Sequence, residues 1–160
     1  MLNRRAVIPA LALAALWTLS PGSPRTAVAQ EAASPKAVIE TRQASLKKMG
    51  AAMKAIVEQL KTSSPDTARM TAAMQVISAG APEISRWFPA GTGPESGVET
   101  DALPHIWEDR AKFDSLATGL VAESKNLAAA ISGSDPGALR AQVKVVADVC
   151  SSCHRSFRAD

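Results

Sequence analysis

The strongest constraint on the fold of this chain is a proline near the start of each of four segments. These segments open at Ser34-Pro35, Ser64-Pro65, Pro104 and Asp135-Pro136. Ser or Asp before Pro is typical of a helix start, because the side chain caps a free backbone N–H and Pro lacks only an N–H that would be unpaired anyway. Gly133 lies where the third segment should stop. The pattern predicts four helices.

Apolar residues in these segments recur at the period of an α-helix. In the first segment they are Leu46, Met49, Met53, Ile56 and Leu60, and in the last they are Leu139, Val143, Val146, Cys150, Cys153 and Phe157. Steps of three and four residues place such side chains on one buried face. The sequence has no sustained alternation of period two. We therefore predict an all-α fold, an antiparallel up-down four-helix bundle.

The first 29 residues have the pattern of a secretory signal peptide. Arg4 and Arg5 precede an apolar run, and small residues before a cleavage site end at Ala29. The run, residues 6–19, is 14 residues long, fewer than the about 18–20 that span a bilayer. We expect residues 1–29 to be removed on export to the periplasm. Residues 30–160 then form one domain without stable membrane association.

The charge of the mature chain argues against nucleic acid as a partner. The sequence has 18 Lys and Arg against 15 Asp and Glu. Three of the cations, Arg4, Arg5 and Arg25, lie in the expected signal peptide, which leaves 15 basic and 15 acidic residues. A net charge near zero and the lack of a basic run with interleaved aromatic residues predict no nucleic-acid binding.

Residues 81–104 depart from the helical pattern. The stretch APEISRWFPAGTGPESGVETDALP is rich in Pro and Gly, and it is longer than the about 2–8 residues usual between bundle helices. It also holds Trp87 and Phe88, in a chain with few aromatic residues. We expect this segment to cover part of the bundle.

Both cysteines lie in the last segment, in the sequence VVADVCSSCHRSFRAD. A disulfide between Cys150 and Cys153 is permitted in an exported protein, but it would close only a tiny loop. A redox dithiol normally starts a helix in a fold that contains strands, and zinc needs four N or S ligands where this stretch offers three. Cys-x-x-Cys-His is also the attachment sequence of c-type haem, in which His154 would bind the iron.

Helical spacing favours haem. Residues three and four apart share a helix face, so Cys150, Cys153 and His154 present one edge to a flat cofactor. The two cysteines continue the apolar stripe of their segment, and export takes the chain to where c-type haem is attached. We predict one covalent haem c per chain, with His154 as the metal ligand.

Three stretches of the mature chain together resemble the cytochrome c′ family, the class II c-type cytochromes. They are AVIETRQASLKKMG in the first helix, GTGPESGVETDALPHIWEDRAKF before and into the third, and CSSCHRSFR at the end. The resemblance covers nearly all of the mature chain. It implies a four-helix bundle with a C-terminal haem site, commonly assembled as a homodimer through the first two helices.

The resemblance also implies individual site residues. Cys150 and Cys153 match the thioether attachments, His154 matches the proximal ligand, and Arg158 matches a basic residue beside it. Arg42 and Gln43 match a pair that contacts the haem propionates, and Leu46 matches the distal residue over the iron. Asp101 matches a loop position that can approach the haem edge, and Trp87, Phe88 and Trp107 match aromatic residues that pack on haem. His105 departs from the family, which often has an acidic residue there.

A leucine over the iron bears directly on function. Leu46 has no lone pair, so the iron would be five-coordinate and high-spin, and an apolar pocket suits neutral NO and CO. We expect a haem protein that binds these gases and cycles between Fe(III) and Fe(II) with redox partner proteins. We find no constellation for substrate turnover and expect no enzyme. The alternatives are a low-spin electron-transfer cytochrome with a ligand such as Met49, and a dithiol oxidoreductase without haem.

Overall fold

The computed structural model describes residues 33–159, which form five α-helices and two short 3₁₀ helices. The α-helices are α1 (Pro35–Gln59), α2 (Thr67–Gly80), α3 (His105–Glu108), α4 (Arg110–Ser132) and α5 (Pro136–Phe157). The 3₁₀ helices are η1 (Ala81–Trp87) and η2 (Pro94–Ser96). The expected signal peptide lies outside the described residues, so its removal stays a prediction.

Two predicted helix starts are confirmed, and one is shifted. The Ser34 side chain caps α1 by accepting a hydrogen bond from the Ala37 N–H at 3.3 Å. Asp135 caps α5 by accepting from the backbone N–H groups of the next turn, one of them at 2.8 Å. The second helix begins at Thr67 rather than at Pro65, because Asp66 takes the capping role and accepts from the Arg69 N–H at 3.1 Å.

The third predicted helix is interrupted near its start. Asp109 adopts φ −118° and ψ 59°, which ends α3, and α4 begins at the next residue. The Asp109 side chain then caps α4 by accepting from the Lys112 N–H at 3.2 Å. The prediction of one continuous helix from Pro104 was therefore wrong, whereas its end at Gly133 is confirmed.

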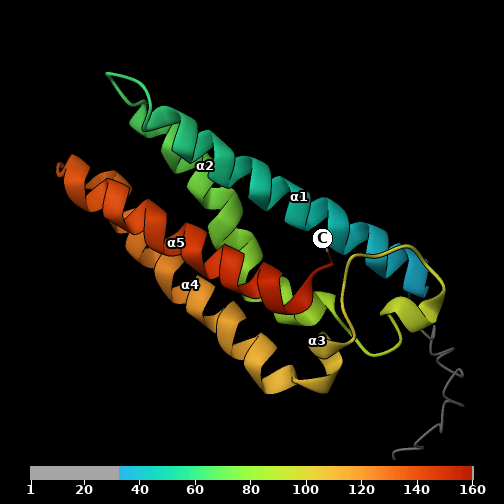
Figure 1. Cartoon of the computed structure of the whole chain (residues 1–160). Coiled ribbons are helices and arrows are strands. Elements are labelled where there is room, and N and C mark those ends of the chain that lie inside the picture. The colour runs from blue at the N-terminus through green and yellow to red at the C-terminus, as the bar shows by residue number, and fades with distance from the viewer. Residues whose placement is uncertain (1–32, 160) are drawn as a thin grey trace, which may run out of the picture. The chain divides into compact units, whose positions relative to one another are not determined.

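The four long helices form the predicted antiparallel up-down bundle (Figure 1). α1 packs mainly on α2, α5 packs on α4, and α2 packs on α4. α1 and α5 make little direct contact along their facing sides. In the part of the chain from 33 to 159, strand-like pairing is limited to one isolated bridge between Ala102 and Arg158. None of the helices in this part has the length and apolar character that a membrane crossing requires.

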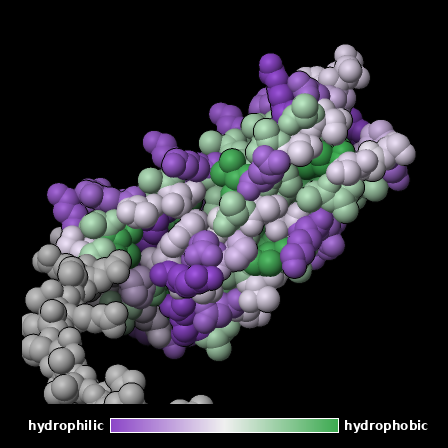
Figure 2. Space-filling view, turned by 180° about the vertical axis from the view of Figure 1, so that it is seen from behind, coloured by the Kyte–Doolittle hydropathy of each residue, from purple (hydrophilic) through white to green (hydrophobic). Residues whose placement is uncertain are grey.

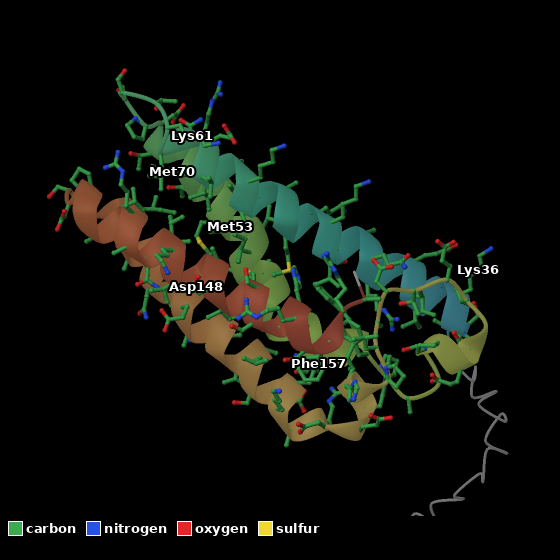
Figure 3. The ribbon with its side chains drawn as sticks, in the orientation of Figure 1. Lys36, Met53, Lys61, Met70, Asp148 and Phe157 are labelled. Carbon is green, nitrogen blue, oxygen red and sulfur yellow. The ribbon has the colours of Figure 1, made fainter. Side chains whose placement is uncertain are left out.

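The apolar stripes form the core, as their spacing predicts, except that Leu46 of the first stripe is 36% exposed. Ile56, Phe113, Leu127 and Val146 are almost completely buried and belong to one cluster that joins α1, α2, α4 and α5. Figure 2 shows polar side chains spread over one face of the bundle, with only small apolar areas between them. Figure 3 shows that Lys36, near the start of α1, extends away from the bundle, whereas Met53 points toward α5.

The segment between α2 and α4 covers the end of the bundle where α5 finishes, as expected. The Leu103 N–H donates to the Phe157 carbonyl at 3.0 Å, and the Ala159 N–H donates to the Asp101 carbonyl at 2.8 Å. The Arg110 guanidinium holds the other side of this segment by donating to the Phe88 carbonyl at 2.9 Å. These bonds fix the loop beside the facing sides of α1 and α5.

Candidate functional site

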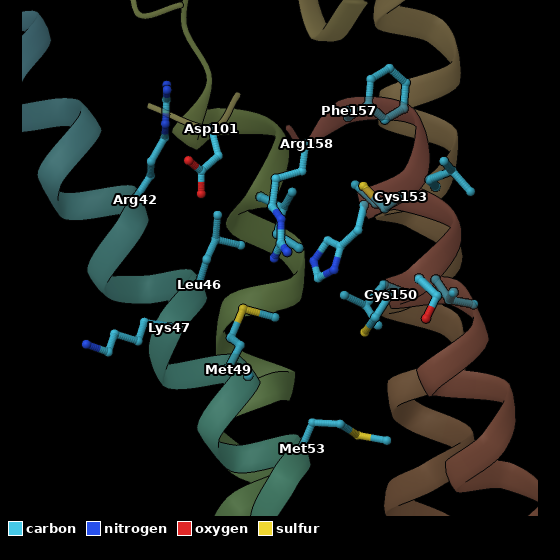
Figure 4. A pocket seen from close by; sticks show the side chains of 18 of the residues that line it. Arg42, Leu46, Lys47, Met49, Met53, Asp101, Cys150, Cys153, Phe157 and Arg158 are labelled. Carbon is cyan, nitrogen blue, oxygen red and sulfur yellow. The ribbon is translucent and has the colours of Figure 1, made fainter. Parts of the chain in front are cut away.

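A cavity of about 920 Å³ lies between α1 and α5, with α4 and the loop at residues 100–102 completing its wall (Figure 4). Cofactor pockets usually have about 300–1,000 Å³. The middle of the wall is apolar and includes Leu46, Met49, Met53, Leu116, Leu120 and Val146. Polar residues of the wall include Arg42, Gln43, Thr100, Asp101 and Arg158. An apolar wall with cations among its polar residues fits a flat apolar ring that carries carboxylates.

Cys150 and Cys153 lie half-buried on the α5 side of this cavity and are not joined in a disulfide. Burial raises the pKa of both thiols, and the neighbouring Cys150 raises the pKa of Cys153 further. A redox dithiol relies on a lowered thiol pKa, since the thiolate is the reacting form. The raised pKa of both thiols therefore argues against the alternative of a dithiol oxidoreductase.

His154 lines the same side of the cavity one residue after Cys153. Although the residue is exposed in part, desolvation at the cavity lowers the pKa of its imidazole, and the Arg158 cation lowers it further. A lowered pKa keeps the imidazole neutral at pH 7, and the neutral form is the one that ligates metals. The spacing argument is thus supported, because both thiols and the imidazole line one cavity.

The C-terminus of α5 brings Arg158 and Asp101 to one end of this cavity. The Arg158 N–H donates to the His154 carbonyl at 3.0 Å as the helix ends, and the bridge to Ala102 then fixes the backbone of Arg158. Figure 4 shows the side chains of Asp101 and Arg158 between α1 and α5, with Leu46 beside them. Loop pairing, rather than helix packing, positions these two charges.

Leu46 and Gln43 lie on the α1 side, across the cavity from α5. Leu46 lines the cavity and is 36% exposed, so the space in front of it is open to solvent. Gln43 also lines the cavity, and its amide donates to the Glu99 carbonyl at 3.2 Å. The residue expected over the iron and the residue expected below it therefore lie on opposite walls.

Arg42 is the most buried charged residue of the site, with 2% of its surface exposed. Its guanidinium donates to the hydroxyls of Thr92 and Thr100, both at 2.8 Å, and lies 4.5 Å from the centre of the Phe88 ring. Desolvation lowers its pKa, while the Glu95 carboxylate acts in the opposite sense.

The Arg42 side chain has bonding capacity to spare. Among residues 33–159 it takes part in no ion pair, and only some of its five N–H donors are used. A buried cation without a paired carboxylate fits a place that receives an anionic group from a ligand. The charge and the free N–H donors of Arg42 are therefore suited to bind a haem propionate.

The aromatic residues divide into two groups. Phe88 lines the cavity, whereas Trp87 and Trp107 are not on its wall. Trp107 lies behind Phe88, with its ring edge-on at 6.2 Å between centroids, and its indole N–H donates to the Pro89 carbonyl at 3.1 Å. Trp107 thus supports the loop around Arg42, and its expected packing on haem stays a prediction.

Sequence reasoning missed the two hydroxyls that hold Arg42. Thr92 and Thr100 are 50 and 58 residues from Arg42 along the chain, within the irregular loop. No periodic pattern points from a helix to a loop residue at such a separation. The expectation that this segment covers something was the only available signal.

Comparison with known proteins agrees with the fold and with haem c as the cofactor. The model of the family described as Cytochrome C′ matches residues 37–158. The cytochrome c′ of Rhodopseudomonas palustris is 38% identical over 123 residues, which are 76% of this chain and 82% of that protein.

Two solved structures superpose on 80% of this chain and 98% of their own. One is a cytochrome c′ described as having an unusual ligand-controlled dimer dissociation, with a TM-score of 0.72 and 28% identity. The other is the nitric oxide complex of a cytochrome c prime variant from Alcaligenes xylosoxidans, with a TM-score of 0.70 and 26% identity. These similarities confirm haem c as the cofactor and show that the chain belongs to the cytochrome c′ family.

Proposed function

We propose that this chain is an exported haem protein that binds NO or CO at a five-coordinate, high-spin iron and cycles between Fe(III) and Fe(II). Bound haem c supplies an open sixth position for a diatomic ligand and a one-electron redox couple. The observation that carries the proposal is Leu46, which lies across the cavity from the helix of His154 and has no atom that can ligate iron.

The apolar part of the wall favours neutral gases. Leu46, Met49 and Met53 of α1 offer no strong hydrogen-bond donor there, although the donors Gln43 and Lys47 line other parts of the same wall. Polar bound O₂ needs such a donor for stabilisation, whereas NO and CO do not. Partial exposure of Leu46 leaves a route from solvent.

We assign the other residues as follows. Cys150 and Cys153 form the thioether bonds, and His154 is the proximal ligand. Desolvation at the cavity and, to a smaller extent, the Arg158 cation lower the pKa of His154, which favours the neutral imidazole that ligates iron. Arg42 and Gln43 face the propionates, and Asp101 lies near the haem edge.

Several features of the protein in the cell belong to the same proposal. The presequence of residues 1–29 directs export, and residues 30–160 form the haem domain in the periplasm. Nitric oxide binding is supported by the Alcaligenes xylosoxidans complex, and a homodimer is supported by the cytochrome c′ with ligand-controlled dissociation. We propose a gas-binding and electron-carrying role with redox partner proteins rather than an enzymatic one.

A second function is favoured by one observation. Met49 is buried on the cavity wall, and Met53 lies half-buried on the same wall. A thioether that reached the iron would make it six-coordinate and low-spin, as suits a pure electron-transfer cytochrome.

Absorption spectra of the mature protein separate the two functions. The oxidised and dithionite-reduced protein is measured alone and then with CO and NO. Gas binding at an open site predicts a high-spin spectrum, with a broad reduced Soret band that shifts sharply on adding CO. Narrow, split α and β bands without a CO response would refute the open site and favour a methionine ligand.

A further inference from the structure

α1 and α2 approach closely where Met49 meets Gly80, the last residue of α2. A Cβ atom on residue 80 would lie 2.5 Å from the Met49 sulfur, 3.1 Å from its Cγ and 3.4 Å from its Cε. The backbone of Gly80 is ordinary right-handed helix, with φ −81° and ψ −37°. A side chain at this position would therefore force the flexible end of Met49 to shift, and the constraint is one of space rather than of backbone conformation.

The Met49 side chain has two neighbours of different kinds. On one side it touches Gly80, and on the other it borders the cavity between α1 and α5. It follows Leu46 by three residues on α1, so it belongs to the same wall, across from the helix of His154. Figure 4 shows Met49 next to Leu46 on α1.

A thioether in this place is a potential ligand. Methionine is a common sixth ligand of haem c, and its side chain has three rotatable bonds with which to reach an iron atom. An open sixth position therefore requires Met49 to be held elsewhere. The space beside Gly80 gives the Met49 sulfur a position away from the iron.

We propose that Gly80 gives the Met49 thioether room against α2 and thereby keeps it off the sixth position of the haem iron. Gly80 is then a positioning residue that sets the coordination number through Met49. This inference rests on the proposed function and adds the residue that maintains the open site. A side chain at position 80 would displace the Met49 sulfur. The cavity is the open space into which the displaced sulfur can move.

The test is Gly80→Ala in the haem-loaded protein, followed by absorption and electron paramagnetic resonance spectra of both oxidation states. We expect conversion from high-spin to low-spin iron, a raised reduction potential and a weakened CO response. Gly119→Ala in α4 is the matched control, because a Cβ there meets nothing within 4 Å, and it should stay high-spin. Met49→Leu combined with Gly80→Ala should return the spectrum to high-spin, because leucine has no sulfur.

The outcomes separate the inference from the function beneath it. A high-spin wild type with an equally high-spin Gly80→Ala variant would overturn the inference alone. A low-spin signal that survives Met49→Leu would overturn it as well. A low-spin wild type would refute the proposed function and, with it, the inference that depends on it.

A second variant covers the case in which Gly80→Ala does not accumulate with haem. Leu46→Ala removes side-chain volume next to Met49 and gives a displaced thioether more room. Leu46→Ala alone should be high-spin, and Leu46→Ala with Gly80→Ala should be low-spin. Two high-spin spectra would overturn the inference.

Discussion

The replacement Arg42→Met tests the buried cation that ties α1 to the loop. It removes the guanidinium and both of its hydrogen bonds while keeping an unbranched side chain of similar length. Thr92 Oγ1 still donates to the Pro89 carbonyl at 2.8 Å, and Thr100 Oγ1 still accepts from the Ala102 N–H at 3.2 Å. Neither hydroxyl is therefore left without a partner.

The expected loss follows from these contacts. A hydrogen bond from a charged group contributes about 1.5–3 kcal/mol; of the two at Arg42, the bond to Thr92 is buried and the bond to Thr100 is partly buried. Stacking on the Phe88 ring adds about 1 kcal/mol. Relief from burying the charge, which the lowered pKa of Arg42 reflects, offsets a large part. The net loss in the free energy of unfolding should be about 2–4 kcal/mol.

Urea unfolding of the haem-loaded protein, followed by circular dichroism, measures this loss. Arg140→Met is the control, because Arg140 is exposed on α5 and surface substitutions change stability by less than about 0.5 kcal/mol. Thr92→Val, combined with Arg42→Met in a double-mutant cycle, should give a coupling energy of about 1 kcal/mol or more. A loss below about 0.5 kcal/mol for Arg42→Met, or additivity in the cycle, would refute the argument.

Three further replacements test the site and the bundle. Cys150→Ala combined with Cys153→Ala should abolish haem staining on a denaturing gel, because only thioether bonds keep haem on an unfolded chain; persistent staining would exclude these two attachment points. Leu46→Ala should speed CO binding by about tenfold in stopped-flow measurements, because less side chain has to move from the sixth position, and an unchanged rate would place the barrier elsewhere. A hydrogen bond from Ser85 and the ion pair with Arg110 hold the pKa of Asp114 below its ordinary value. The ionised carboxylate therefore stabilises the fold at neutral pH. This stabilisation is lost as the pH falls below about 4 and the carboxylate is protonated. The difference in urea midpoint between wild type and Asp114→Asn should therefore be largest near pH 7 and shrink toward pH 3; a difference independent of pH would contradict it.

Much of the fold could be predicted because its signals are local. Ser34 and Asp135 cap their helices through bonds to N–H groups two or three residues away, so these caps can be recognised from one turn of sequence. The interruption at Asp109 is equally local, but it was missed because the apolar spacing on both sides continues with the same period. The shift from Ser64 to Asp66 was missed for a different reason: both residues are good caps, and only the folded chain selects one.

The sequence by itself determined the haem attachment segment, because residues at i, i+3 and i+4 share a face in any helix. Tertiary structure alone decided what surrounds that segment. The bonds of Arg42 to a loop 50 or more positions away, the position of Leu46 across the cavity from α5, and the contact of Met49 with Gly80 all join elements distant in the chain. Such contacts depend on how whole helices pack, and helical period constrains only which face each helix offers.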